Sequence, residues 1–276
     1  MELGISSLGY IIEYGFSNKF ESLVELVYRA TEDCLNFAEQ NEIDIVELVL
    51  EPPEVLYSER KNDFIDLIRS YSLSKQVHGP FIDVNLCSHN PIISDASVAS
   101  CTDAAQFCPK IDVKVLTIHP GLANFLINSI RDKNKFQLAR AFNKLQDRLN
   151  PIQISVCLEN MPQNCFIMSN ENDIEKTFSI INNKDLFFTY DTSHFYTCDG
   201  DVKSLWEKFH KIIKNVHVVD NSSKTSDEHP PLGSGKVNFR EIFEIIKSYD
   251  YKGALIIELS TAKDLTKSIE FIKKFL

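Results

Sequence analysis

No stretch of the 276-residue sequence stays apolar for the roughly 20 residues that a membrane-spanning helix requires. The first ten residues, MELGISSLGY, lack the basic stretch followed by an apolar one that marks a secretory signal. The seven cysteines include no C-x-x-C pair, which indicates reduced thiols rather than a disulfide framework. These absences predict a cytoplasmic protein with no membrane segment.

Basic residues are also in short supply. Lys and Arg number 29 against 39 Asp and Glu, so the formal net charge is −10. This excess of acid disfavours a broad electrostatic grip on nucleic acid and suits a site that gathers cations. Linkers, low-complexity segments and repeats are missing as well, while 43% of the residues are apolar, an ordinary share for a sizeable core. We therefore expect one domain over residues 1–276.

The sequence does contain a regular alternation of short apolar runs with longer amphipathic ones. The short runs predict strands at 3–7, 44–50, 75–79, 112–119, 152–159, 186–191, 215–220 and 253–259. The longer runs predict helices near 18–40, 60–71, 94–108, 131–149, 171–182, 201–213, 238–248 and 263–275. Eight strands alternating with eight helices predict a parallel sheet, and eight is the number that closes a (β/α)8 TIM barrel. An open doubly wound sheet is the alternative fold.

Ionisable residues recur at or near the ends of these strands, where TIM barrels carry their functional sites. In chain order they are His78, His119, Glu159, Asp191, His217 and Glu258. Loops that follow the sixth and seventh strands add His194 in YDTSH and the pair Asp227 and His229 in DEH. A single histidine of this kind is more often structural, and a single acid is as often a helix cap. Because these residues all lie at or just after strand ends, we expect them to form one functional site.

Strand periodicity sharpens this expectation, because alternate residues of a strand share a face. In IQISVCLE the aliphatic residues lie on one face and Glu159 lies on the other, so Glu159 is expected to point into the barrel mouth. An inward carboxylate is costly unless a positive group meets it. Lys114, the one basic residue of the fourth strand, lies on the face opposite His119. We therefore predict a divalent metal, because carboxylates and imidazoles together bind Zn²⁺, Mn²⁺ or Fe²⁺.

The motifs VHGPFIDVNL, IHPG, CLENMP, YDTSH, HVVDN, DEHPPLGSG and IIEL resemble, in order and spacing, those of the endonuclease IV family within the xylose isomerase-like TIM barrels. The resemblance spans nearly the whole chain. It implies a hydrolase of DNA repair that cuts DNA at abasic sites and carries two or three zinc ions. The implied ligand groups are, first, His78, His119 and Glu159; second, Glu159, Asp191, His217 and Glu258; third, His194, Asp227 and His229. Phe81 and Ile82 stand where the family places a wedge that contacts the substrate.

The sequence departs from the family where DNA would be gripped. The loop EPPEVLYSERK after the second strand brings Glu51 and Glu54 before any basic residue, and Glu228 stands between Asp227 and His229. These carboxylates would repel a phosphate backbone. We therefore expect DNA binding to be weak.

A sugar or sugar-phosphate isomerase or epimerase is the alternative function. That branch typically needs only Glu159, Asp191, His217 and Glu258 around one ion, for which Mn²⁺ or Mg²⁺ is possible. Glu159 and Glu258 would then be the catalytic pair that exchanges a proton at the carbon beside a carbonyl, and the substrate would be a small sugar phosphate. A degenerate barrel kept only for binding is disfavoured, because every ligand position is filled. Nothing in the sequence identifies a protein partner.

Overall fold

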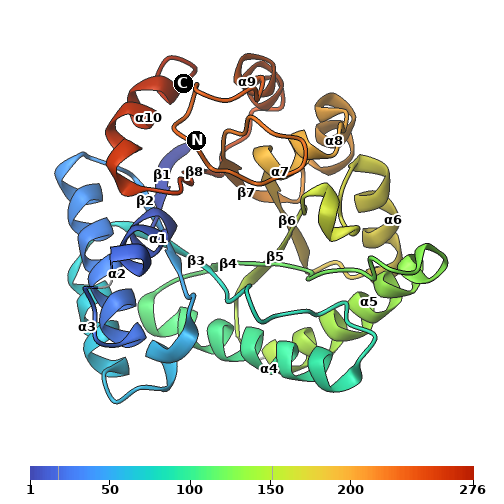
Figure 1. Cartoon of the computed structure of the whole chain (residues 1–276), viewed down its shortest axis with the longest axis horizontal. Helices are drawn as coiled ribbons and strands as arrows, with labels where there is room; N and C mark the ends of the chain where they lie inside the picture. The colour runs from blue at the N-terminus through green and yellow to red at the C-terminus, as the bar shows by residue number, and fades with distance from the viewer. Residues whose placement is uncertain (18, 151) are drawn as a thin grey trace.

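The computed structural model describes residues 1–17, 19–150 and 152–276. Within these residues, eight parallel strands pair in chain order and close into a barrel, which confirms the predicted (β/α)8 TIM barrel (Figure 1). The strands are β1 (Glu2–Ser6), β2 (Ile45–Val49), β3 (Ser74–His78), β4 (Val115–Ile118), β5 (Ser155–Glu159), β6 (Leu186–Asp191), β7 (Ile213–Val218) and β8 (Ala254–Ile257). Each lies within or beside its predicted run.

The helices surround the barrel (Figure 1). They are α1 (Leu8–Ser17), α2 (Leu23–Gln40), α3 (Lys61–Ser70), α4 (Pro91–Phe107), α5 (Arg131–Leu149), α6 (Glu171–Ile181), α7 (Thr192–Thr197), α8 (Val202–Phe209), α9 (Phe239–Ser248) and α10 (Leu265–Ile272). Short 3-10 helices are η1 (Pro53–Tyr57), η2 (Cys108–Ile111), η3 (Asn128–Ile130), η4 (Gln163–Cys165) and η5 (Ala262–Asp264).

Two helices, α1 and α7, were absent from the sequence-based prediction. The prediction began its first helix at residue 18, which lies outside the described residues, whereas α2 begins at Leu23, where the Ser22 side chain accepts a hydrogen bond from the Glu25 N–H. Both unpredicted helices follow a strand almost directly, so no loop sequence separates strand from helix. Asp191 ends β6 and also caps α7, accepting a hydrogen bond from the His194 N–H.

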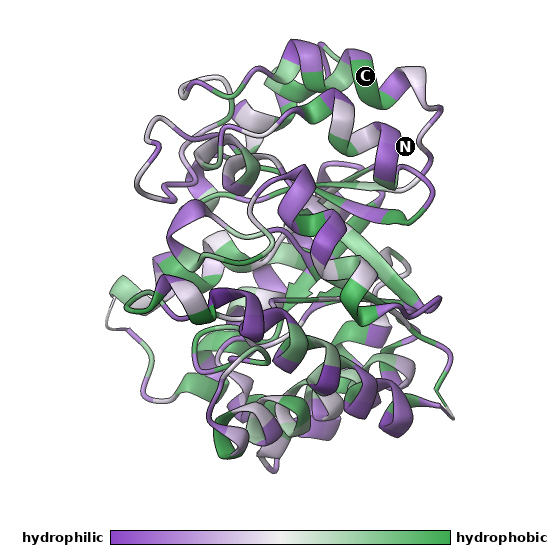
Figure 2. Ribbon diagram, turned by 90° about the vertical axis from the view of Figure 1, so that its right-hand side faces the viewer, coloured by the Kyte–Doolittle hydropathy of each residue, from purple (hydrophilic) through white to green (hydrophobic). Residues whose placement is uncertain are grey.

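The barrel interior is layered. Ile45, Ala254 and Ile256 form a small apolar cluster at the amino-terminal end of the strands. Above it lies a polar layer in which the Thr117 and Thr189 hydroxyls are 2.8 Å apart. Outward-facing strand residues pack instead under the helices, which carry both apolar and polar residues in Figure 2. This polar layer is followed, toward the carboxyl ends of the strands, by the barrel mouth.

Two further expectations concern the cysteines and membrane-spanning helices. All seven cysteines are free, in agreement with the expected reduced thiols. In the part of the chain that the structure describes, no helix is both long and apolar enough to cross a membrane.

Candidate metal centre

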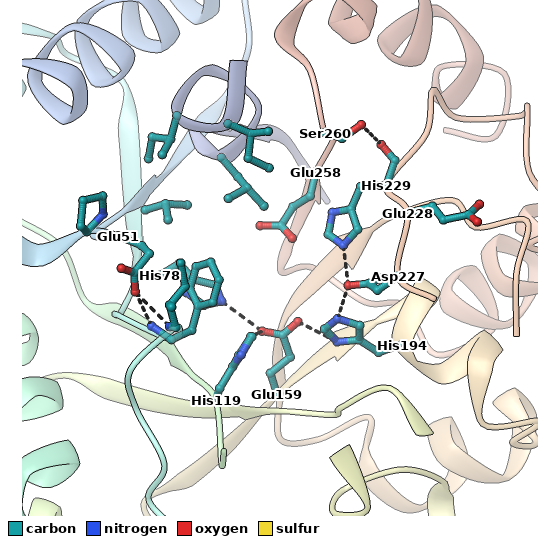
Figure 3. Close-up of a pocket in the computed structure, with 17 residues that line it drawn as sticks. Glu51, His78, His119, Glu159, His194, Asp227, Glu228, His229, Glu258 and Ser260 are labelled. Carbon is teal, nitrogen blue, oxygen red and sulfur yellow. Dashed lines mark hydrogen bonds and ion pairs between the residues drawn. The ribbon is translucent and has the colours of Figure 1, made fainter. Parts of the chain in front are cut away.

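Glu159 lies at the centre of the barrel mouth, surrounded by imidazoles (Figure 3). It is the last residue of β5, and its side chain is buried. Glu159 Oε2 lies 3.2 Å from His78 Nε2 and 3.1 Å from His119 Nε2. Glu159 Oε1 lies 3.0 Å from His217 Nδ1 and 3.4 Å from His194 Nδ1. One carboxylate thus contacts histidines from four different segments of the chain.

Two groups of ligand-type atoms share this carboxylate. Their members lie within 4.8 Å of one another, and they are His78, His119 and Glu159 in one group and Glu159, Asp191 and His217 in the other. The Glu258 Oε2 atom lies 3.7 Å from His217 Nδ1, which brings the eighth strand to the second group. The six residues predicted to meet at one end of the barrel are therefore together.

A third group, His194, Asp227 and His229, also fits within 4.8 Å. Asp227 Oδ2 lies 3.0 Å from His194 Nε2 and 2.9 Å from His229 Nε2. The Ser193 hydroxyl donates a 2.6 Å hydrogen bond to the other oxygen of Asp227. The His229 carbonyl accepts hydrogen bonds from the Ser260 backbone N–H and side chain, at 2.9 and 3.1 Å.

The loop that carries Asp227 and His229 is fastened by Asp220, a buried residue two positions after the end of β7. Asp220 Oδ2 accepts hydrogen bonds from the N–H groups of Gly233 and Gly235, both at 2.8 Å, and Oδ1 accepts one from Val237 at 3.2 Å. A Cβ atom at Gly235 would lie 2.2 Å from Asp220 Oδ1. The segment LGSG (232–235) is thus the turn that returns this loop to the barrel.

Two of the histidines are oriented by backbone carbonyls. His78 Nδ1 lies 2.8 Å from the Gly79 carbonyl, and His194 Nδ1 lies 2.8 Å from the Asn160 carbonyl. Since an imidazole nitrogen must carry a hydrogen to donate to a carbonyl, Nδ1 is the fixed donor of each ring, and Nε2 is the nitrogen that can bind a metal once it loses its own proton. His78 Nε2 faces Glu159 and His194 Nε2 faces Asp227, the positions where a cation would lie.

Sequence reasoning missed several residues that hold this arrangement in place. Asn160 accepts a hydrogen bond from the Asp191 N–H and donates one to the Asp191 carbonyl, linking the ends of β5 and β6. Glu47 lies on β2 beneath His217 and is fully buried. The signal for Glu47 was available, because it is the only acid inside the apolar core IVELV of its strand.

The electrostatics of the site favour positive charge. Burial opposes charge on His217 and His194, yet the surrounding carboxylates outweigh it and hold both pKa values well above the ordinary value. Burial likewise raises the pKa of Glu159, but His217 and His119 outweigh that effect and hold it well below the ordinary value. Asp191 differs, because burial raises its pKa to about 7. Protons on these imidazoles supply the positive charge that the carboxylates require.

Unpartnered atoms indicate where a cation fits. Asp191 Oδ2, Glu258 Oε1 and His229 Nδ1 are buried and have no hydrogen-bond partner among the described residues. Buried polar atoms are rarely left in this state without a reason. Oxygen and imidazole ligands together suit zinc and other divalent transition ions. The residues present therefore fit a divalent metal.

A cavity of about 390 Å³ opens onto all three groups. One wall is apolar and comes largely from α1, through Leu8, Ile11 and Ile12. Phe81 and Ile82 also line the cavity, and the Phe81 ring centroid lies 5.3 Å from that of His78. Among the described residues that line this cavity there is no Lys or Arg.

The acids expected to repel DNA are not equivalent. Glu228 is exposed and lines the cavity, as expected. Glu54 is exposed within η1. Glu51, expected as a rim charge, is instead buried, and its Oε2 accepts hydrogen bonds from the N–H groups of Phe81 and Ile82 at 2.9 and 3.1 Å. Glu51 lines the cavity, so it lies at the mouth as expected, but it is buried and holds the loop after β3 rather than standing as an exposed charge.

The comparison with protein families matches residues 35–275 to the xylose isomerase-like TIM barrel. The chain belongs to this family. The uncharacterized protein MJ1311 of Methanocaldococcus jannaschii is similar to this chain. The two are 30% identical over 263 residues, which cover 92% of this chain and 87% of that protein.

Other proteins similar to this xylose isomerase-like barrel have names that describe two reactions. A probable endonuclease 4 of Mycobacterium tuberculosis is 22% identical over 214 residues, 75% of this chain and 81% of that protein. A crystal structure of a D-tagatose 3-epimerase-like protein superimposes with a TM-score of 0.82 at 26% identity, covering 100% of this chain and 97% of that one. Both are enzyme names within one fold.

Proposed function

We propose that this chain is a divalent-metal-dependent phosphodiesterase of the endonuclease IV type, with zinc as its ion and abasic sites in DNA as its target. The observation that carries the proposal is the third group, His194, Asp227 and His229, beside the two groups that share Glu159. An isomerase that uses one ion has no evident need for it. The endonuclease IV resemblance assigns a ligand role to every member of all three groups.

The chain's own residues divide the work of hydrolysis. When bound, divalent ions supply Lewis-acid stabilisation of a phosphate and make a water molecule more acidic. Glu159 would join the first two groups, one oxygen facing each. Glu258 lines the cavity and has a free Oε1, so it is placed to accept the proton of an attacking water. Phe81 and Ile82 would contact the sugar and base beside the cleaved bond.

The second candidate is a sugar or sugar-phosphate epimerase acting at the same site. The specific observation in its favour is the cavity wall, because the described lining residues include neither Lys nor Arg to hold a DNA backbone. Glu159 and Glu258 both line this cavity and would exchange a proton on either side of a bound sugar.

One variant separates the two functions. Asp227→Asn removes the charge of the third group and leaves Glu159, Asp191, His217 and Glu258 intact. We expect it to abolish nicking of a duplex with one abasic site, measured without added magnesium on metal-loaded protein. The neighbouring Glu228→Gln, which removes an equal charge outside the ligand groups, is the matched control and should retain nicking.

The contrary result is equally concrete. Wild-type protein that leaves abasic duplex intact at low salt, yet exchanges the proton beside the carbonyl of a ketose or ketose phosphate with solvent deuterium, would overturn the nuclease proposal. Retention of that exchange by Asp227→Asn would then assign the reaction to the four residues of the second group.

A further inference from the structure

Glu47 is a buried carboxylate at the centre of the barrel that the proposed reaction does not use. It lies on β2, where it pairs in register with Gln76 of β3, and none of its surface is exposed. Its Oε2 accepts hydrogen bonds from Gln76 Nε2 at 2.8 Å and Asn215 Nδ2 at 2.9 Å. Burying a carboxylate has a large desolvation cost, so its presence at this depth calls for a partner.

That partner is the imidazole of His217. Glu47 Oε1 lies 3.0 Å from His217 Nε2, and Oε2 lies 3.3 Å from the same nitrogen. If Nε2 carried a lone pair, it would face two carboxylate oxygens and be repelled by both. Nε2 therefore carries a hydrogen, which it donates to Glu47. Asn215 Nδ2 also lies 2.9 Å from His217 Nε2, but it donates its hydrogen bond to Glu47 Oε2 and therefore does not need a lone pair on Nε2.

The consequence appears at the other nitrogen of the ring. When Nδ1 gives up its own proton, the hydrogen held on Nε2 by Glu47 leaves the lone pair of the ring at Nδ1, where a metal would bind. His217 Nδ1 lies 3.0 Å from Glu159 Oε1 and 3.8 Å from Asp191 Oδ2, in the second ligand group. His78 and His194 are held in the same manner, but by backbone carbonyls. Among these three rings, His217 is the one whose orienting hydrogen bond runs to a carboxylate outside the two groups that share Glu159.

We infer that Glu47 is a positioning residue for the metal centre, which fixes the ring orientation and tautomer of His217 and increases the basicity of its Nδ1. A carboxylate hydrogen-bonded to a ligand histidine acts in this way, and its loss typically weakens metal binding by about 10- to 100-fold. The inference rests on the metal centre proposed above. Glu47, His217 and Glu258 also place ligand-type atoms within 4.8 Å, so the rival reading is that Glu47 is itself a ligand.

The test compares metal binding by wild type and Glu47→Gln, after removal of metal with a chelator. Zinc affinity is measured by competition with a chromophoric chelator, and cobalt(II) binding by its visible absorption. We expect Glu47→Gln to bind the same number of ions as wild type at saturation, with about 10- to 100-fold weaker affinity for one of them. The cobalt spectrum should also change, because the basicity of His217 changes.

Thr117→Val is the matched control. Thr117 is fully buried in the same polar layer and forms hydrogen bonds with Thr189 and Asn215, but none with His217 among the described residues. It should retain the affinity and the cobalt spectrum of wild type. Equal losses in Thr117→Val and Glu47→Gln would mean that Glu47 only fills the barrel, and the inference would be wrong.

Other outcomes are distinguishable. Loss of one ion at saturation in Glu47→Gln would make Glu47 a ligand and overturn the positioning role. Wild-type protein that binds no divalent ion would overturn the metal centre itself. If Glu47→Gln does not fold, ¹⁵N NMR of the imidazoles in zinc-loaded wild type decides the matter, because His217 should carry its hydrogen on Nε2. A hydrogen on Nδ1 would refute the inference.

Discussion

Replacing Glu159 by Gln should weaken two metal sites at once. The substitution preserves volume but removes the charge that four imidazoles now contact, two at each carboxylate oxygen. Structural zinc sites with four ligands bind with about 10–16 kcal/mol, or roughly 3 kcal/mol per ligand. At about 1.4 kcal/mol for each tenfold change, losing one ligand weakens binding roughly 100-fold. Because one oxygen faces each group, the loss should apply to both ions.

Elemental analysis of protein purified without added metal, followed by zinc titration of the chelator-treated protein, measures this effect. Wild type should hold at least two ions and Glu159→Gln at most one, with no residual activity. Glu13→Gln is the control, because Glu13 on α1 accepts a hydrogen bond from Thr261 outside the ligand groups. Two tightly bound ions in folded Glu159→Gln, or one ion in active wild type, would refute the shared-carboxylate model.

Further predictions concern the loop after β7 and its surroundings. Metal-free protein should lose stability from about pH 6.5 to 9: burial opposes charge on His229, but Asp227 outweighs it and raises the pKa to about 9. A histidine whose pKa is raised on folding stabilises the folded state fully below its unfolded-state pKa, near 6.5, and no longer does so above its folded-state pKa. The pKa of Asp227 is lowered, so this carboxylate stays ionised over the whole range. A melting temperature in chelator that does not change over this range would contradict the prediction. Asp220→Asn should cost about 1–3 kcal/mol in urea unfolding, because the partly buried N–H groups of Gly233 and Gly235 lose a charged acceptor, and unchanged stability would argue against the fastening role. Glu228→Arg should tighten binding to abasic duplex and make the slope of log K against log salt more negative by about 0.9 for one added phosphate contact, whereas an unchanged slope would place Glu228 away from the DNA.

Strand periodicity was enough to anticipate the inward side of the barrel. Glu159 ends β5 on the face opposite that strand's aliphatic residues, His119 and Glu258 directly follow β4 and β8, and all three line the cavity. A parallel barrel brings the ends of all its strands to one mouth, so residues far apart in sequence could be expected to meet. Their role as metal ligands stays a prediction.

The supporting contacts could not be anticipated in the same way. The hydrogen bond between Glu47 and His217 joins residues 170 positions apart, and it depends on the register between strands. Glu51 illustrates the same difficulty, since its sequence neighbours suggest a loop charge while its partners, Phe81 and Ile82, come from the next strand's loop. α1 was missed because it starts two residues after β1, and with it the apolar wall of the cavity.

The three ligand groups differ in what carries them. The first two lie in, or one residue beyond, strands of the barrel, whereas His194 lies on the short α7, and Asp227 and His229 lie on a loop held by Asp220. Mutations confined to these segments can therefore delete the third group while the strand-borne groups and the barrel persist. Gain or loss of the third group on this scaffold therefore needs changes only in α7 and the loop after β7, and no change of fold.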